Sequence, residues 1–202
     1  MNKINFDKIN NFCKFENMIF FNADIAFVYL YELISLTGYK CQDTKALYNV
    51  GFTMKYPDRN EITSNFRGWN KEYADKEWKW YLTKDPNALE ISKSAPIWKN
   101  HMNDKDEVNS NYGYQWHRNN QYDKVIEMLK KDKETRRAVL TIYDGKEIND
   151  YEKDTPCTLN IGFRIRKGYL DMSVMMRSND LWYGFCNDQY CFSKLQIDIA
   201  EE

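Results

Sequence analysis

The C-terminal half of the chain carries a strand, turn and strand pattern that commits this region to a β-sheet. The runs "CTLNIGFRI" (157–165) and "YLDMSVMM" (169–176) have strand-like composition and flank the pair Lys167 and Gly168. A tight hairpin turn favours glycine, because its backbone must enter the left-handed region. A third strand-like run, "RRAVLTIYD" (136–144), lies just upstream. We therefore predict a sheet whose strands come mainly from the C-terminal half.

Helical spacing of apolar residues predicts helices that would cover this sheet. Helices are expected at roughly 24–37, about 70–83, 120–132, and from near Asn187 to the end. A strand is expected within 46–56, and the stretch 84–111 is expected to form loops and short turns. Helices mixed with strands indicate an α/β or α+β fold. No repeat or linker divides the chain, so one domain over residues 1–202 is predicted.

The charge balance and cysteine usage narrow the classes of partner. Lys plus Arg number 29 and Asp plus Glu number 30, a net charge of -1 that does not favour nucleic-acid binding. No apolar run approaches the roughly 18 residues of a membrane span, and no signal-peptide pattern occurs, so a cytoplasmic protein is expected. Five unevenly spaced cysteines suit a reducing compartment. Without a CxxC pair, and with two histidines, no metal site is expected.

Cys157 and Arg177 are candidate reactive groups at the two far ends of the predicted hairpin. If the strands pair, Arg177 returns to the level of Cys157, where its guanidinium would favour the nucleophilic thiolate. Cys157 could instead be a small buried apolar residue. A cysteine hydrolase is a further alternative, but it needs an imidazole partner, and His101 and His117 lie in loop-like segments.

Several motifs together resemble the thymidylate synthase family, which includes the deoxycytidylate hydroxymethylases. In chain order they are "KEWKWYL", "IWKNHMND", "SNYGYQWH" (110–117), "KETRRAVLTIYD" (133–144), "TPCTLNIGF" (155–163) and "MMRSNDLWYGF" (175–185). The resemblance extends from about residue 45 onward. It implies a thymidylate synthase-like fold, with a mixed β-sheet covered by helices and a homodimer formed through the sheet face.

The resemblance also implies a transferase reaction. Its one-carbon donor is the co-substrate 5,10-methylenetetrahydrofolate, and its acceptor is C5 of a pyrimidine deoxynucleoside monophosphate. Cys157 would add to C6 of the base, which makes C5 nucleophilic. Glu77 matches the family's glutamate that handles protons through ordered water. It also lies on an aromatic helix face, where desolvation would raise its pKa, although it could simply be a partly exposed residue at the edge of that face.

Ligand-binding roles follow from the same resemblance. Arg177 and Ser178 match the phosphate-binding pair beside the nucleophile, and Arg136 and Arg137 match arginines lent across the dimer interface; such a pair could otherwise be a solvated strand edge. Three further residues resemble those around the reacting base and the folate, although packing would also explain the two aromatics: Tyr112 for the base, and Trp98 and Asp180 for the folate.

The resemblance implies that Asp188 occupies the position that reads the C4 edge of the base. Thymidylate synthases have asparagine there, whereas a carboxyl group matches the amino group and N3 of cytosine. Thr158 after the nucleophile also agrees with the cytosine-type enzymes. Asn187 and Asp188 could instead cap the last helix, and a one-residue slip would place Asn187 at the reading position and restore uracil. Deoxycytidylate 5-hydroxymethylation is therefore preferred, with deoxyuridylate methylation as the alternative.

Two departures from the family pattern affect this prediction. An arginine expected in "GYKCQDTKALYNV" (38–50) has no counterpart. The family's C-terminal strand and closing segment are also expected to be missing after Glu202. The chain is thus expected to be either a fragment or a homologue that only binds nucleotide or dimerises.

Overall fold

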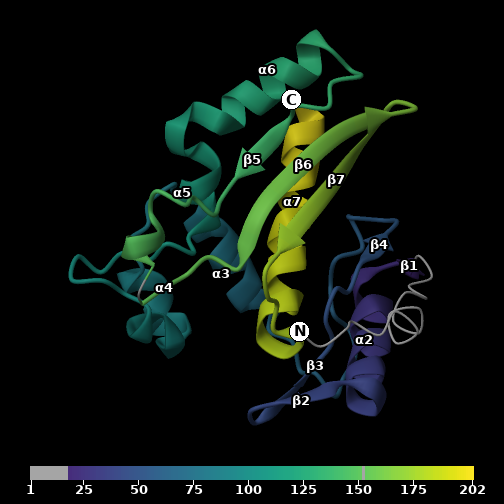
Figure 1. Cartoon of the computed structure of the whole chain (residues 1–202), viewed down its shortest axis with the longest axis vertical. Helices are drawn as coiled ribbons and strands as arrows, with labels where there is room; N and C mark the ends of the chain where they lie inside the picture. Colours follow the sequence, from purple (N-terminus) through teal and green to yellow (C-terminus); the bar gives the residue numbers. More distant parts are fainter. Residues whose placement is uncertain (1–17, 152) are drawn as a thin grey trace, which may run out of the picture. The chain divides into compact units, whose positions relative to one another are not determined.

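The computed structural model describes residues 18–151 and 153–202 and groups them into two compact units. The boundary between the units falls between Gly68 and Trp69. Each unit is described separately below (Figure 1). The single domain predicted over 1–202 remains a prediction. No helix in the described ranges is both long enough and apolar enough to cross a lipid bilayer.

The N-terminal unit is built around helix α2, Ala23–Thr37, as predicted for 24–37. Its start is capped by Asn22, whose Oδ1 accepts a hydrogen bond from the Ile25 amide at 2.8 Å, and Gly38 follows its last residue. The predicted strand in 46–56 is replaced by short pieces. The strands form one parallel and one antiparallel pair: β1 (Met18–Phe20) with β4 (Phe52–Met54), and β2 (Tyr39–Cys41) with β3 (Thr44–Ala46).

The C-terminal unit contains the other two predicted internal helices and the final helix. They are α3 (Lys71–Leu82), α6 (Gln121–Lys131) and α7 (Cys186–Glu201). Two six-residue helices, α4 (Leu89–Ser94) and α5 (Tyr112–His117), were not predicted. Short helical turns occur at Pro96–Asn100, Arg118–Asn120, Ile148–Asp150 and, as a π-helix, Leu181–Phe185.

The sheet of this unit consists of β5 (Val139–Thr141), β6 (Thr158–Arg166) and β7 (Tyr169–Met176), in that spatial order. The predicted hairpin is confirmed, because Lys167 and Gly168 have φ values of 52° and 80°. All pairs in this sheet are antiparallel, so the expected mixed sheet is not found among the described strands. For β6 and β7 the reason is the two-residue turn between them, since parallel neighbours need a long crossover.

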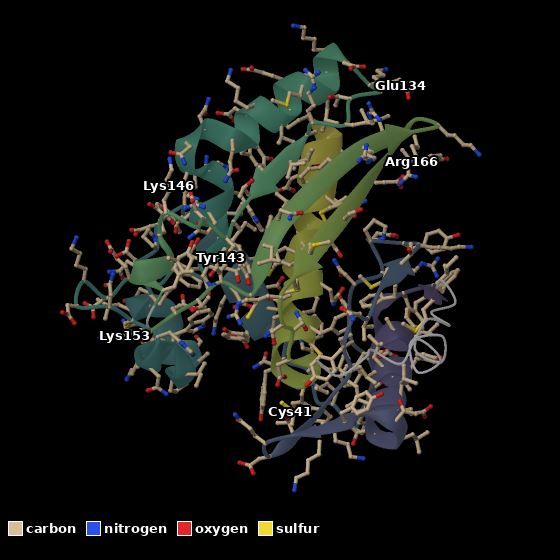
Figure 2. The ribbon with its side chains drawn as sticks, viewed as in Figure 1. Cys41, Glu134, Tyr143, Lys146, Lys153 and Arg166 are labelled. Atoms are coloured by element: carbon tan, nitrogen blue, oxygen red, sulfur yellow. The ribbon has the colours of Figure 1, made fainter. Side chains whose placement is uncertain are left out.

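The hydrophobic core lies between one face of this sheet and helix α7, which runs behind β6 and β7 in Figure 1. Leu140, Ile161 and Phe163 point from the sheet into this core, and Leu195 meets them from α7. Residues on the alternate face remain exposed, as side chains alternate along strands. Arg166, labelled in Figure 2, lies at the last position of β6 beside the hairpin turn. The opposite end of the hairpin holds Cys157 and Arg177.

Candidate active site

Strand pairing brings Cys157 and Arg177 together, as predicted. Cys157 directly precedes β6 and Arg177 directly follows β7, and the neighbouring residues Thr158 and Met176 are paired. The Arg177 amide donates to the Cys157 carbonyl at 2.9 Å. The Arg177 Nη2 lies 3.8 Å from the Cys157 Sγ. A guanidinium therefore contacts the candidate nucleophile.

The Arg177 side chain also fixes the loop that carries Cys157. Its Nε donates to the Pro156 carbonyl at 3.0 Å, and its Nη2 donates to the Thr155 carbonyl at 2.8 Å. Arg177, Ser178 and Asp180 are all solvent-exposed in the loop between β7 and α7. The guanidinium can therefore hold the loop and still face an anion from solvent.

The pKa of the Cys157 thiol is raised above its ordinary value. Burial is the main cause, Arg177 opposes it, and the negative charges of Asp188 and Asp154 add to the increase. The expectation that Arg177 favours the thiolate is right in direction, but burial outweighs it.

Helix α3 places Glu77 in the same region. The side chain is 6% exposed, and its Oε2 has no hydrogen-bond partner. Burial, together with the charge of Asp188, raises the pKa of Glu77 to about 8, against the opposing effect of the Tyr73 and Tyr81 hydroxyls. A carboxyl group in this state carries its proton at neutral pH and can exchange it with a ligand.

Asp188 lies in the first turn of α7. Its Oδ2 accepts a hydrogen bond from the Asn179 Nδ2 at 2.8 Å. Burial raises the pKa of Asp188 to about 7, the Asn179 hydrogen bond opposes this, and the charge of Asp180 adds to it. A Cβ at Gly184 would lie 3.4 Å from Asp188 Oδ2, an ordinary van der Waals contact.

Asn187, the neighbour of Asp188, has other hydrogen-bond partners. The Asn187 Oδ1 accepts from the Trp69 Nε1 at 2.9 Å, and its Nδ2 donates to the Tyr183 carbonyl at 3.3 Å. Helix α7 has no side-chain cap hydrogen bond at its start, so neither residue serves as its cap. Asn187 is therefore engaged by Trp69 and Tyr183, whereas the charge of Asp188 acts on Cys157.

Two further candidate residues border the same cluster. Tyr112, at the start of α5, is buried, and burial together with the charge of Asp188 raises its pKa well above the ordinary value. Trp98 is half-buried, and its Nε1 donates to the Tyr73 hydroxyl, which contacts Glu77. Asp180 is more peripheral. Its Oδ1 accepts from the Tyr183 amide at 2.6 Å and caps the π-helix.

Arg136 and Arg137 do not join the cluster in the same chain. They are exposed and precede Ala138, whose carbonyl accepts from the Phe163 amide at 2.9 Å. Phe163 lies five residues along β6 from Thr158, or about 17 Å at the usual rise of about 3.4 Å per residue. Both arginines therefore lie toward the opposite end of the sheet from Cys157.

The two histidines make other contacts. The His101 Nδ1 lies 3.2 Å from the Lys153 carbonyl. The His117 Nδ1 lies 2.8 Å from the Gly113 carbonyl, and its ring stacks on Tyr122 at 4.6 Å. The geometry thus offers no support for a cysteine hydrolase. Across the described residues, no cluster of three or more His, Cys, Asp or Glu side chains could hold a metal ion.

Comparison with known proteins identifies the family. The thymidylate synthase domain family matches residues 29–202. The chain belongs to the thymidylate synthase family. The resemblance seen in the motifs is confirmed by this match, as is the α/β class of the fold.

Individual relatives within the thymidylate synthase family have different named activities. Deoxycytidylate 5-hydroxymethyltransferase of Enterobacteria phage T4 is 35% identical over 142 residues, which is 66% of this chain and 57% of that protein. Deoxyuridylate hydroxymethyltransferase of Bacillus phage SP01 is 45% identical over 69 residues, 33% of this chain and 18% of that protein. Thymidylate synthase of Bacillus mojavensis is 24% identical over 150 residues, covering 69% and 53%. The chain spans less than two thirds of the length of each of these relatives.

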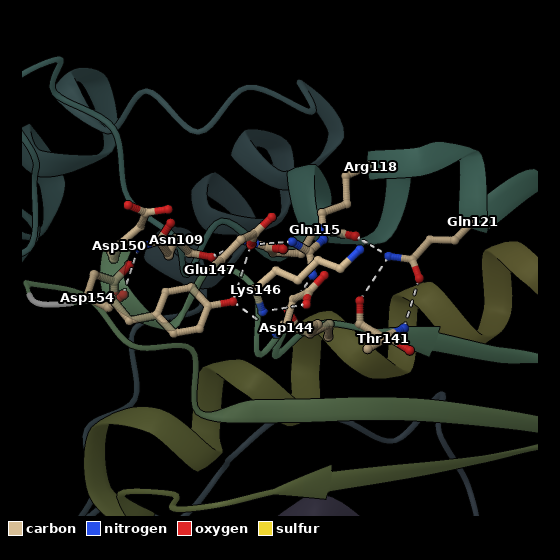
Figure 3. A network of polar contacts seen from close by, with 12 residues as sticks. Asn109, Gln115, Arg118, Gln121, Thr141, Asp144, Lys146, Glu147, Asp150 and Asp154 are labelled. Atoms are coloured by element: carbon tan, nitrogen blue, oxygen red, sulfur yellow. Dashed lines mark hydrogen bonds and ion pairs between the residues drawn. The ribbon is translucent and has the colours of Figure 1, made fainter.

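This family member contains a polar network, upstream of Cys157 in the sequence, that the motifs did not reveal (Figure 3). The Asp154 carboxylate accepts from the Ser110 amide at 2.6 Å and from the Ser110 hydroxyl at 2.7 Å. The Asn109 Nδ2 donates to the carbonyls of Asp150 and Asp154 at 3.0 and 2.9 Å. The network joins the loop before Cys157 to the segment before α5.

Arg118 anchors the other end of that loop. Its guanidinium pairs with Glu147 and donates to the Ile142 carbonyl at 2.7 Å. Asn179 and Tyr73 were missed as well. Asn179 lies within the quoted "MMRSNDLWYGF" motif, and Tyr73 lies one helical turn before Glu77, so spacing alone could have suggested both.

Proposed function

We propose that this chain takes part in folate-dependent one-carbon transfer to C5 of a pyrimidine deoxynucleotide, with deoxycytidylate as the preferred acceptor and a hydroxymethyl group as the product. The observation that carries the proposal is the position of Asp188. Its charge acts on Cys157, Glu77 and Tyr112 together, which supports a carboxyl group close to the candidate nucleophile. Asn187, the residue that would read uracil after a one-residue slip, is held by Trp69 instead.

The proposed reaction begins at Cys157. Its thiolate adds to C6 of the base, and the C5 carbon then becomes nucleophilic toward the one-carbon unit. Arg177 acts twice in this proposal, since it favours the thiolate and fixes the carbonyls of the loop that carries it. With Ser178 it would also bind the 5′-phosphate, because both are exposed beside the nucleophile.

Base selection would depend on the protonation of Asp188. With a pKa of about 7, the group exists in both forms at neutral pH. Cytosine presents an amino donor at C4 and a lone pair at N3. The carboxyl group can accept from the amine and share a proton with N3. Asn179 supports this arrangement because it donates to one carboxyl oxygen and leaves the other for the base.

The proposed folate region lies around Trp98 and Asp180. The half-buried Trp98 ring packs edge-on against Trp80 at 5.1 Å and lies next to the Tyr73 and Glu77 pair, so an aromatic surface adjoins a buried carboxyl group. Such a combination suits a planar, polar ring. The folate would supply the one-carbon unit. Glu77, with its partnerless Oε2, would hold or donate the proton that the base requires.

The proposal includes a symmetric homodimer formed through the open face of the sheet. Val139 is 43% exposed and Met175 is 59% exposed on this face, and nothing lies within 4 Å of the Cβ position at Gly162 between them. A sheet face with exposed apolar side chains can pack against the same face of a second copy. Arg136 and Arg137, remote from Cys157 in their own chain, would then serve the partner's site.

Tritium release from C5 tests the proposed function. The wild type is incubated with 5-tritiated dCMP or dUMP and methylenetetrahydrofolate, and products are analysed by mass spectrometry. Release from dCMP is expected, with a hydroxymethyl product and complete loss in Cys157→Ala. Asp188→Asn should shift the preference from dCMP to dUMP by about tenfold or more, since unpaired base-edge groups are costly. Asn187→Ala is the matched control and should keep the wild-type preference.

The arms of this experiment give distinct answers. Release from dUMP alone would overturn the choice of cytosine and support the deoxyuridylate alternative. Release from neither nucleotide, with binding of dCMP retained, would overturn the catalytic proposal and support the nucleotide-binding role.

A further inference from the structure

Three side chains form a directed hydrogen-bond chain that ends at Glu77. The Trp98 Nε1 lies 2.9 Å from the Tyr73 hydroxyl, and this hydroxyl lies 3.3 Å from the Glu77 Oε1. An indole N–H can only donate, so the Tyr73 oxygen accepts from Trp98. The Tyr73 hydroxyl proton is therefore directed to Glu77 Oε1.

This hydrogen-bond chain gives the two carboxyl oxygens of Glu77 different surroundings. Oε1 accepts the hydrogen bond from Tyr73, whereas Oε2 is buried and makes no hydrogen bond within 3.5 Å, although the Tyr81 hydroxyl also lowers the pKa of Glu77. A buried polar atom without a partner is costly, and a ligand can supply the missing partner. Oε2 is therefore the oxygen left to interact with a ligand.

Each residue of this hydrogen-bond chain is held in place by the helix or helical turn that carries it. Tyr73 and Glu77 are one turn apart on α3, a spacing that places them on the same side of the helix. Trp98 belongs to the short helical turn Pro96–Asn100, and its ring packs against Trp80. Burial, with the charge of Glu77, raises the pKa of Tyr73 well above its ordinary value, so Tyr73 keeps its proton and remains a donor.

We propose that Tyr73, held by Trp98, is a positioning residue that places the transferable proton of Glu77 on Oε2, facing the ligand. The inference rests on the proposed function, in which Glu77 exchanges a proton near the pyrimidine. The pKa of about 8 supports it, because Glu77 then carries a proton at neutral pH. Other titratable groups act on the same region: Asp188 and Cys191 from α7, and Tyr81 from α3.

Direct titration of Glu77 tests the positioning role without relying on turnover. Protein labelled with ¹³C at the glutamate carboxyl carbons is titrated by NMR, and Glu77→Gln assigns the signal. Wild-type Glu77 should titrate near pH 8. Tyr73→Phe should move the midpoint upward, because the lost hydrogen bond favours the ionised form. Trp98→Phe should move it in the same direction by less, since Tyr73 is then less strongly polarised.

Tyr169→Phe is the matched control. Tyr169 lies at the start of β7 and is 77% exposed, so its loss should leave the Glu77 midpoint unchanged. Near-ultraviolet circular dichroism confirms that each variant is folded. An unchanged midpoint in folded Tyr73→Phe protein overturns the inference.

Kinetics provide a second readout that separates positioning from binding. With the favoured nucleotide, Tyr73→Phe should lower kcat about tenfold to a hundredfold and leave KM close to wild type, since misplacement of a catalytic group affects the transition state. The pH profile of kcat should move in parallel with the NMR midpoint. A rise in KM at constant kcat contradicts the inference. Absence of wild-type tritium release would instead count against the proposed function, while the NMR result still decides the positioning of Glu77.

Discussion

At the scale of single residues, burial and specific partner side chains have opposite effects on the pKa values of the acidic groups in the site. Burial raises the pKa of Cys157, Glu77 and Asp188 alike. Each group also has partners that oppose the shift: Arg177 for the thiol, Tyr73 and Tyr81 for Glu77, and Asn179 for Asp188. The result is a cluster of neutral or half-ionised acids that can exchange protons near neutral pH.

The raised pKa of Cys157 predicts slow alkylation that accelerates with pH. A raised pKa lowers the thiolate fraction at every pH below it, and the thiolate is the reactive form. Cys157 should therefore react with iodoacetamide more slowly than the exposed Cys41 at pH 7. The difference between the two rates should become smaller as the pH rises. Peptide mass spectrometry resolves the two sites. Arg177→Ala should slow Cys157 further, because Arg177 lowers its pKa. A Cys157 rate above that of Cys41 at pH 7 contradicts this prediction.

At the scale of elements, the long periodic segments were predictable and the short ones were not. Helices α2, α3 and α6 lie within one or two residues of their predicted bounds, because each repeats its apolar spacing over three turns or more. Helices α4 and α5 have six residues each, too few for a period to emerge. Gly113 of α5 packs so tightly on Tyr81 that a Cβ there would lie 1.8 Å from the Tyr81 carbonyl oxygen.

In the candidate site, too, some contacts could be predicted from the sequence and others could not. Cys157 and Arg177 could be placed together from the hairpin alone, since pairing fixes which ends meet. Asp188 was preferred over Asn187 from the family resemblance and not from periodicity, because a π-helix at Leu181–Phe185 precedes α7 and interrupts the α-helical spacing. The contact between Ser110 and Asp154 joins residues 44 positions apart in loops, where no periodic pattern exists.

The hydrogen bonds of Asp154 predict that this carboxylate stabilises the loop before Cys157. Asp154→Asn should lower the free energy of unfolding by about 1–3 kcal/mol, because the amide cannot accept both hydrogen bonds from Ser110 in the same way. Urea denaturation measures the change. Tritium release should also fall, since Cys157 lies three residues after Asp154.

An exposed aspartate in the same region provides the control. The Asp104 carboxylate pairs with Lys153 at 3.4 Å on the surface. Asp104→Asn should leave the free energy of unfolding close to that of the wild type, as exposed pairs contribute little. Equal losses for the two variants would show that the Asp154 contacts have no special role.

At the scale of the whole molecule, the nucleophile and the two remote arginines lie toward opposite ends of a sheet that has one exposed face. Cys157 lies at one end of the hairpin, whereas Arg136 and Arg137 precede β5 toward the other end. The two sets of residues therefore cannot meet within one chain. In a twofold dimer through the open face, the arginines of one chain could reach the site of the other.

Mixing two inactive variants tests this arrangement. Cys157→Ala keeps its arginines, and the double variant Arg136→Ala with Arg137→Ala keeps its cysteine. In an equal mixture of exchanged subunits, about half of the dimers contain one chain of each kind, and one of the two sites in such a dimer is complete. Tritium release should therefore return to about a quarter of the wild-type value, with dimers verified by light scattering.

A second mixture provides the control for that result. Cys157→Ala is combined with Glu77→Gln, whose altered residue lies in the same chain's site as Cys157. Every site in a mixed dimer then contains a defect, so no recovery is expected. Recovery in both mixtures, or in neither, would contradict the sharing of arginines between subunits. Recovery only in the first would establish that a complete site draws its nucleophile from one chain and its remote arginines from the other.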